Sequence, residues 1–136
     1  MNLNSILYED NHLIAINKKS SEIVQGDRTG DRTMPDTIKS YLKEKYNKPG
    51  NVFCGVIHRL DRPTSGVILF ARTSKGLERM NKQFRDKETT KTYWAILENK
   101  PPQDEGTLSN YVKKNEKQNK SYVTSMDTKG AKKAIL

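Results

Sequence analysis

The stretch His58-Arg59-Leu60-Asp61-Arg62-Pro63-Thr64-Ser65-Gly66, followed directly by Val67-Ile68-Leu69-Phe70-Ala71, is the most informative part of this 136-residue sequence. Its proline and glycine favour a turn, and the five apolar residues that follow are typical of a fully buried strand. Its one carboxylate, Asp61, stands between two arginines, and nearby guanidinium groups keep a carboxylate ionised at neutral pH. The sequence therefore predicts a nucleophile or general base at the edge of a buried strand. Beside a phosphate-rich ligand, the arginines would instead bind the polymer and leave the carboxylate free for chemistry.

The overall composition favours a polyanionic partner. The formal net charge is +9 at pH 7 and the isoelectric point is about 9.6, with 33% hydrophobic and 30% charged residues. A chain of this length forms one domain with a modest core. Because the sequence has no basic amphipathic helix with aromatic anchors, we expect a nucleic acid and no membrane as the partner.

Cysteine and histidine content restricts the chemistry further. The single cysteine, Cys54, excludes an internal disulfide, fits a reducing cytoplasm and is expected to be a small buried filler. There is no signal peptide and no long apolar span, so we expect a cytoplasmic protein. With two histidines and one cysteine, a protein metal site is disfavoured. A phosphate-binding Gly-x-x-x-x-Gly-Lys-Ser/Thr loop is also absent from the sequence, so a nucleoside triphosphatase is not supported.

Two helices are predicted. The first begins near Pro35, with Thr33 as its cap and Asp36 near its positive end. Its inward residues recur at helical spacing and are Ile38, Leu42 and Tyr46. The second helix follows the apolar strand and is capped by Thr73 or Ser74. Its inward residues, interpreted as core, are Leu77, Met80 and Phe84.

The remaining apolar segments predict strands. An opening hairpin pairs a strand ending at Tyr8 with Leu13 to Asn17, and the alternation of Lys91 to Leu97 predicts another strand. Three later strands are expected around Thr107 to Val112, Ser121 to Met126 and Ala131 to Leu136. Strands and helices are interspersed and do not alternate strictly as βαβ units. We therefore expect an α+β fold, with helices packed on a largely antiparallel mixed sheet.

The order His-Arg-Leu-Asp, then Thr-Ser-Gly, in residues 58–66 resembles the signature of the RluA-type pseudouridine synthases. Three more segments resemble the same family: the opening strand pair, Phe70 to Lys75, and the Lys-x-Tyr-x-Ala pattern of Lys91 to Ala95. The resemblance runs over the whole of residues 1–136 and implies the catalytic-domain fold of that family. One position departs from the pattern, because the family usually has Lys-Pro-x-Gly where this chain has Lys18-Lys19-Ser20-Ser21.

The resemblance implies that Asp61 is the essential catalytic residue. Three routes stay open: attack on the sugar C1′, attack on the base C6, or removal of a sugar proton. The structural alternative is a turn aspartate held in a salt bridge by Arg59 or Arg62. The resemblance also gives Tyr93 a catalytic role against the target base, assisting proton transfer from C5; an ordinary core tyrosine on a strand is the competing interpretation.

Arg59 and Arg62 are the predicted RNA-binding residues. The target uridine must leave its stack to reach Asp61, and the guanidinium plane of Arg59 is suited to fill the vacated space. The other signature residues are expected to shape the loop without taking part in the reaction; they are His58, Leu60, Thr64, Ser65 and Gly66. Isomerisation of uridine involves no redox change and returns every atom to the same base, so no cofactor or metal is expected.

The leading hypothesis is thus an RNA pseudouridine synthase, acting on a specific uridine in ribosomal or transfer RNA. A second hypothesis is an RNA-binding fragment without turnover. A third is a glycosidase-like hydrolase that uses Asp61 with Glu78 or Glu88, although neither glutamate lies in a recognisable site motif.

The end of the sequence suggests an amino-terminal portion of a longer catalytic domain, occupying residues 1–136 without an S4 module. In the family the last strand continues, and a later segment rich in Arg, His and Gln completes the site; the sequence has no match to that segment. A sheet that ends in this way leaves an unpaired edge. We therefore expect strand pairing between chains, strand swapping or a disordered tail.

Overall fold

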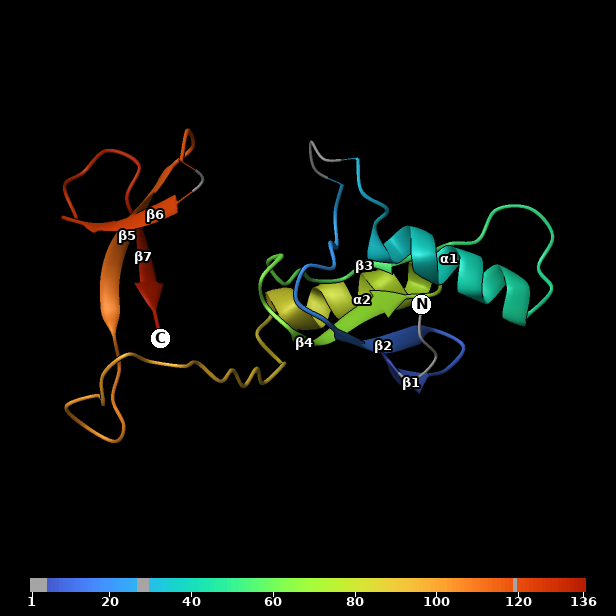
Figure 1. Cartoon of the computed structure of the whole chain (residues 1–136), viewed down its shortest axis with the longest axis horizontal. Helices are drawn as coiled ribbons and strands as arrows, with labels where there is room; N and C mark the ends of the chain where they lie inside the picture. Colours follow the sequence, from blue (N-terminus) through green and yellow to red (C-terminus); the bar gives the residue numbers. More distant parts are fainter. Residues whose placement is uncertain (1–4, 27–29, 119) are drawn as a thin grey trace. The chain divides into compact units, whose positions relative to one another are not determined.

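The computed structural model describes residues 5–26, 30–118 and 120–136. It has an α+β fold whose two antiparallel sheets belong to two compact units, Met1–Thr92 and Tyr93–Leu136 (Figure 1). The predicted fold class is therefore confirmed. The stretch around Asp61 lies in the first unit.

The first unit is built on four strands. They are β1 (Ile6–Glu9), β2 (Leu13–Lys18), β3 (Gly55–Val56) and β4 (Gly66–Ala71), in the order β1-β2-β4-β3. All neighbouring strands are antiparallel, and the predicted opening hairpin is present as β1 and β2. The two-residue strand β3 was not predicted, because it is too short to show an alternating pattern.

One face of this sheet holds the core. In the register of β2 and β4, Ile14 lies opposite Phe70 and Ile16 lies opposite Ile68, so these four side chains share a face. All four are at most 1% exposed. The helix α1 (Met34–Lys45) covers them with Ile38 and Leu42, among other residues. Burying an aliphatic or aromatic side chain of this size stabilises the fold by about 1.5–3 kcal/mol.

The start of α1 follows the predicted capping pattern. The Thr33 side chain accepts a hydrogen bond from the Asp36 backbone, and the Asp36 side chain accepts one from the Thr33 backbone. Pro35 lies in the first turn, where its missing N–H leaves no bond unmade. This reciprocal capping box fixes where the helix begins.

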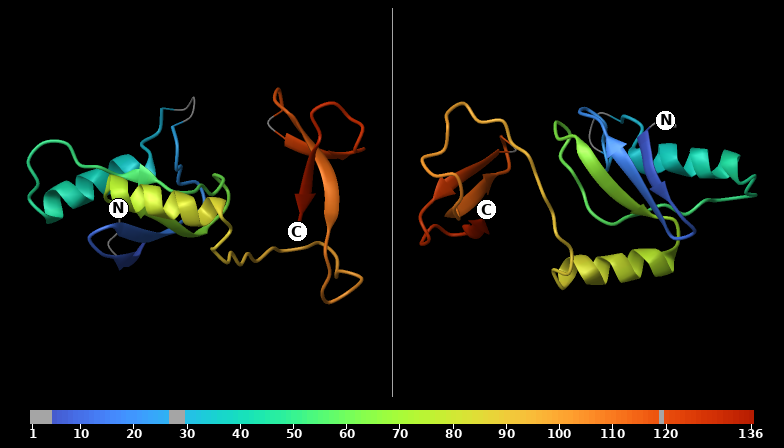
Figure 2. Two further views of the ribbon diagram at one scale, coloured as in Figure 1. Left: turned by 180° about the vertical axis from the view of Figure 1, so that it is seen from behind. Right: turned by 90° about the horizontal axis from the view of Figure 1, so that it is seen from below.

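The second helix, α2 (Ser74–Arg85), is capped by Thr73 and lies on the opposite side of the sheet (Figure 2). Its predicted inward residues are only half-buried, although Leu77 packs closely on Gly55 of β3. A Cβ added to Gly55 would come within 2.9 Å of the Leu77 side chain. Gly76 is similarly close to the backbone of His12, so α2 approaches the sheet through two glycine contacts.

The strand β4 is not fully buried, contrary to the sequence prediction. Ile68, Phe70 and Ala71 are completely buried, but Val67 is 57% exposed and Leu69 is half-buried. The reason is that α1 covers one face of β4, whereas α2 covers the other face incompletely and leaves Val67 exposed. From Val67 to Phe70, the burial of this apolar strand therefore alternates from one residue to the next.

The second unit is a three-stranded sheet in the order β6-β5-β7. Its strands are β5 (Ser109–Asn115), β6 (Lys120–Thr124) and β7 (Lys132–Ile135). They confirm the three late strands that the sequence predicts, with shifted boundaries. The last residue is paired, since Leu108 and Leu136 exchange backbone hydrogen bonds of 2.8 and 2.9 Å.

The predicted strand at Lys91 to Leu97 is wrong, because this segment has no regular structure. Alternation requires a neighbouring strand to pair with, and no ladder of the described residues includes this segment. Trp94 is 97% exposed and Ile96 is fully exposed. Its apolar residues therefore do not form a local core.

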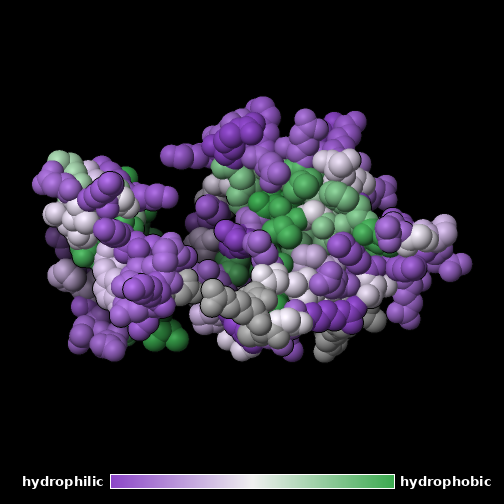
Figure 3. All heavy atoms as spheres, turned by 90° about the horizontal axis from the view of Figure 1, so that it is seen from above, coloured by the Kyte–Doolittle hydropathy of each residue, from purple (hydrophilic) through white to green (hydrophobic). Residues whose placement is uncertain are grey.

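The surface is largely polar. On the face drawn in Figure 3, hydrophobic residues gather in the middle of the first unit and hydrophilic residues surround them. Within residues 5–26, 30–118 and 120–136, neither helix has the length and apolar character needed to cross a bilayer.

Candidate active site

The residues 58–65, which we call the Asp61 loop, connect β3 to β4. The Thr64 N–H donates to the Asp61 carbonyl at 3.0 Å, which closes the turn that Pro63 predicts. Gly66 then begins β4 with φ of 130°, a left-handed value that favours glycine. Gly66 is paired with Lys18 at the end of β2, so the loop lies beside that lysine.

Lys18 holds the backbone of the loop. Its ammonium group donates to the carbonyls of Thr64 at 2.6 Å, Asp61 at 3.1 Å and Arg62 at 3.1 Å, and to that of Lys19 at 3.2 Å. The residue is fully buried. A buried cation needs this many partners, because it has lost its water of hydration. Burial lowers the pKa of Lys18, and the charges of Glu22 and Asp61 act in the opposite direction.

The turn after β2 makes a second contact with the loop. The Ser21 N–H donates to the Arg62 carbonyl at 2.9 Å. Ser21 has φ of 75°, in the left-handed region that glycine prefers. This is the position at which the chain departs from the family pattern by lacking glycine. The backbone conformation is kept although the residue is not the one best suited to it.

Asp61 itself presents an exposed carboxylate. Within the described part of the chain, no hydrogen bond or ion pair reaches its side-chain oxygens. The predicted flanking arginines turn elsewhere: Arg59 donates to Gln25 at 2.6 Å, and Arg62 pairs with Asp31 at 3.0 Å. The expectation that these arginines lie beside the Asp61 carboxylate is wrong, and so is the alternative that they hold it in a salt bridge. The charge that the structure does bring near Asp61 is the ammonium of Lys18.

His58 connects the loop to β4 and α2. Its Nε2 accepts a hydrogen bond from the Leu69 N–H at 3.1 Å, and its ring stacks on Phe84 with centroids 5.1 Å apart. Burial, and to a smaller extent the charge of Lys91, lowers the pKa of His58. These contacts agree with the expectation that His58 shapes the loop.

The remaining predicted residues differ in their surroundings. Leu60 packs against the core and anchors the middle of the loop, while Ser65 is exposed. Tyr93 belongs to the second compact unit, where it is 59% exposed in an irregular segment. Its catalytic role thus remains a prediction from the sequence.

Lys18 is the residue of the candidate site that the sequence prediction missed. A lysine at the end of a strand is normally assigned to solvent, and three of the four hydrogen-bond partners of Lys18 are 43 to 46 residues away. The available signal was its position at the start of the family's Lys-Pro-x-Gly pattern.

The arrangement is suited to chemistry by a carboxylate. A fixed backbone turn presents Asp61 to solvent. A separate hollow of about 150 Å³ is lined in part by Ser21, Glu22 and Asp31 and includes no residue of the Asp61 loop. Among the described residues, no group of three or more His, Cys, Asp or Glu side chains converges as a metal site would require. The half-buried thiol of Cys54 has its pKa raised to about 12 by burial, which makes it a poor nucleophile.

Comparison with known proteins identifies the family of this chain. The family model described as RNA pseudouridylate synthase matches residues 12–136. Ribosomal large subunit pseudouridine synthase C of Buchnera aphidicola is 35% identical over 128 residues, which cover 94% of this chain and 39% of that protein. The dual-specificity RNA pseudouridine synthase RluA of Haemophilus influenzae is 39% identical over 93 residues, which cover 68% of this chain and 39% of that protein.

Solved structures show the same fold. Human RNA pseudouridylate synthase domain containing 4 superposes with a TM-score of 0.76 at 22% identity, over 97% of this chain and 51% of the human chain. Human RNA pseudouridylate synthase domain containing 1 gives a TM-score of 0.69 at 19% identity. The chain therefore spans about half of these structures and 39% of the two curated relatives.

Proposed function

This chain belongs to the RNA pseudouridylate synthase family, and from that premise we propose that it converts a uridine of RNA into pseudouridine with Asp61 as the catalytic residue. The reaction breaks the bond between N1 of uracil and C1′ of ribose, rotates the base, and joins C5 to C1′. The C5 proton leaves and N1 gains a proton, so atoms and electrons balance without a redox partner.

The observation that carries this proposal is the state of Asp61. Its carboxylate is exposed and lacks a hydrogen-bond or ion-pair partner in the described chain, while the backbone that bears it is fixed by the ammonium of Lys18. A group held in position but not neutralised is prepared to act on a substrate. An aspartate that held this turn together would instead use its side-chain oxygens to accept hydrogen bonds from the loop backbone.

We propose large-subunit ribosomal RNA as the substrate and the cytoplasm as the place of reaction. The most similar relatives named above include a ribosomal large subunit pseudouridine synthase. The dual-specificity name of the other relative makes transfer RNA the second candidate. The net charge of +9 supports binding of either polyanion.

Arg59 and Arg62 are proposed as RNA contacts beside the flipped uridine. Both are exposed, and Arg59 is held by a hydrogen bond to the neutral side chain of Gln25. Such a surface bond contributes only about 1 kcal/mol, so Arg59 can exchange it for a phosphate or a base. Tyr93 is proposed to assist proton transfer from C5, as the resemblance implies.

The direct test is release of tritium from uracil labelled at C5 in a large-subunit ribosomal RNA transcript. We expect release with the wild-type chain and none above background with Asp61→Asn. Asp127→Asn is the control, because Asp127 is an exposed aspartate of the second unit. Since the Asp61 side chain makes no bond in the described structure, the substitution should leave the free energy of unfolding within about 0.5 kcal/mol.

Equal release by wild type and Asp61→Asn would contradict the role of Asp61. If wild type binds the transcript without releasing tritium, the chain is an RNA-binding portion of a longer enzyme and the proposed activity of these residues is wrong. The glycosidase hypothesis would be supported only by free uracil among the products.

A further inference from the structure

The exposed side of α2 carries a groove that the proposed chemistry does not use. The groove has a volume of about 620 Å³. Of the described residues that line it, only Leu77 is apolar, so it is not suited to an apolar partner. Its charged members are four cations and one carboxylate, namely Lys75, Arg79, Lys82, Arg85 and Glu78.

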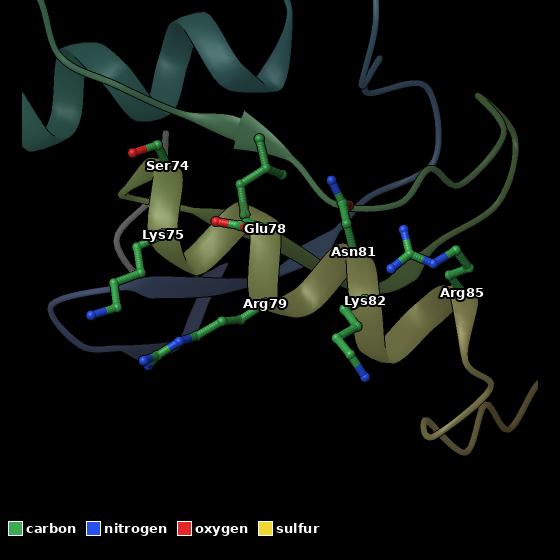
Figure 4. Close-up of a pocket in the computed structure, with 8 residues that line it drawn as sticks. Ser74, Lys75, Glu78, Arg79, Asn81, Lys82 and Arg85 are labelled. Carbon is green, nitrogen blue, oxygen red and sulfur yellow. The ribbon is translucent and has the colours of Figure 1, made fainter.

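Three of the cations form a row. Lys75, Arg79 and Lys82 stand at i, i+4 and i+7 of the helix, which places them on one face. Figure 4 shows them extending from the same side of α2, whereas Ser74 and Asn81 extend from the other side. The rise from Lys75 to Arg79 is about 6 Å. A row of spaced cations is better suited to bind successive phosphates of a polyanion than to bind one small anion.

The first two cations of the row are available. Asp86 neutralises the other end of the helix, since it pairs with Lys82 at 2.7 Å and lies 3.6 Å from Arg85. Neither Lys75 nor Arg79 has an ion-pair partner in the described part of the chain. Both are exposed, so nothing offsets their charge except solvent.

The groove is also connected to the Asp61 loop. The ring of His58 in that loop stacks on Phe84, which lies in the last turn of α2. The helix therefore runs outward from the site, over a length of about 18 Å for its 12 residues. That length corresponds to about five stacked nucleotides.

We propose that this groove binds the phosphate backbone of the substrate RNA along α2, away from the reacting uridine and toward the start of the helix, with Lys75 and Arg79 as the main contacts. The inference rests on the function proposed above, because it takes RNA as the substrate. The contacts carry no sequence information and serve to orient the RNA along α2.

The test compares two charge-neutralised pairs by fluorescence anisotropy with a labelled stem–loop of large-subunit ribosomal RNA. One pair is Lys75→Gln with Arg79→Gln on α2. The matched control is Lys39→Gln with Lys43→Gln on α1, where two exposed lysines have the same i, i+4 spacing. Affinity is measured from about 50 to about 200 mM salt, where counterion release dominates.

We expect the α2 pair to weaken binding to every RNA sequence, and to reduce the slope of log affinity against log salt by about 1 for each cation removed. The control pair should keep the wild-type slope. The exchanged pair Lys75→Arg with Arg79→Lys retains both charges and should also keep it. With an RNA shorter than about five nucleotides, the α2 pair and the wild-type chain should have the same slope of log affinity against log salt.

A slope for the α2 pair equal to that of the control pair would overturn the inference and assign the groove to another class of ligand. So would a loss of binding in the exchanged pair, because that loss would come from helix damage. Tritium release separates this result from the proposed function. If the wild-type chain releases tritium but the α2 pair keeps the wild-type salt slope, the proposed function is supported and the groove is not. If the α2 pair has a reduced salt slope but the wild-type chain releases no tritium, the groove is supported and the proposed function is not.

Discussion

At the scale of single residues, the Lys18 ammonium does for the Asp61 loop what a metal ion does in other loops. It collects carbonyl oxygens from four residues at one point, at distances of 2.6 to 3.2 Å. Three of these carbonyls belong to the turn that carries the Asp61 carboxylate. The position of Asp61 is thus set through its backbone, which leaves its side chain free.

Replacing Lys18 with methionine keeps the length of the side chain but removes the charged donor. We expect the free energy of unfolding to fall by about 2–4 kcal/mol, because the carbonyls lose a charged hydrogen-bond donor. At temperatures where the variant is folded, tritium release should fall about 100-fold, since a displaced catalytic group loses that much. Lys19→Met is the control and should be close to wild type in both measurements. Full activity of folded Lys18→Met would show that the loop keeps its shape without the ammonium.

The left-handed backbone of Ser21 predicts a stabilising substitution. A residue with a Cβ is strained at φ of 75°, and glycine removes that strain at a smaller entropic cost. We expect Ser21→Gly to raise the free energy of unfolding by about 0.5–1 kcal/mol in urea titration. Ser20→Gly should not raise it, because no positive φ is recorded for Ser20. If Ser21→Gly and Ser20→Gly change the free energy of unfolding equally, the left-handed backbone of Ser21 is not the cause and the prediction is wrong.

At the scale of elements, His58 joins the Asp61 loop to β4 and α2 through its neutral ring. Its Nε2 is a hydrogen-bond acceptor, so the proton that forms the imidazolium would displace the Leu69 N–H. The pKa of His58 is lowered in the fold. The stabilisation is therefore complete above the unfolded pKa of about 6.5, and it is lost as pH falls toward the lower folded pKa.

Two substitutions of His58 test this linkage. We expect His58→Phe to keep the stacking on Phe84 but to leave the Leu69 N–H without a partner, at about 1–3 kcal/mol. His58→Gln should be less destabilised, because its amide oxygen can accept that bond. In both variants the fall in unfolding free energy between about pH 7.5 and about pH 5.5 should be smaller than in wild type. If the unfolding free energy of both variants depends on pH as it does in wild type, groups other than His58 cause that dependence.

Elements with local signals were predictable from the sequence. The Thr33 cap and the spacing of Ile38 and Leu42 are contained within one segment, and α1 matches them. The segment Lys91 to Leu97 has an equally clear alternation, yet it forms no strand. A strand depends on a partner elsewhere in the chain, which a local pattern does not report.

The site was predictable in its residues but not in its contacts. The Asp61 loop stands where the motif places it, between two strands. The arginines beside Asp61 in sequence turn to Gln25 and Asp31, whereas the cation near it comes from β2. The sequence prediction assumed that residues adjacent in the chain have adjacent side chains, but the turn directs the Arg59 and Arg62 side chains away from the Asp61 carboxylate. The bonds of Lys18 span more than 40 residues and have no local signature.

At the scale of the whole molecule, the two units differ in their cores. The first unit contains all the buried side chains of the described chain, and none of the described residues from 93 to 136 is buried. A three-stranded sheet needs a covered hydrophobic face to be stable by itself. Its apolar side chains remain available to a partner, and they include Tyr122, Val123, Ile135 and Leu136.

We therefore predict association of the chain through this second sheet. The strands β6 and β7 are its edges, and an unpaired edge accepts a strand from another copy. Light scattering should show a mass that rises with protein concentration. Ile135→Lys should reduce this association, because an edge charge opposes strand pairing. A constant monomeric mass for the wild-type chain would contradict the prediction.

The hydrogen bonds of Lys18 also mean that the Asp61 loop can take its final conformation only after β2 and β4 have paired. The ammonium joins the last residue of β2 to carbonyls made 43 to 46 residues later. During synthesis, β2 leaves the ribosome long before β4 exists to pair with it, and long-range pairing of this kind is slow. The Asp61 loop can close only after Gly66–Ala71 has been made and has found β2. A nascent chain that ends before β4 has paired with β2 already contains Asp61 in its sequence, but its Asp61 loop is not yet held by Lys18.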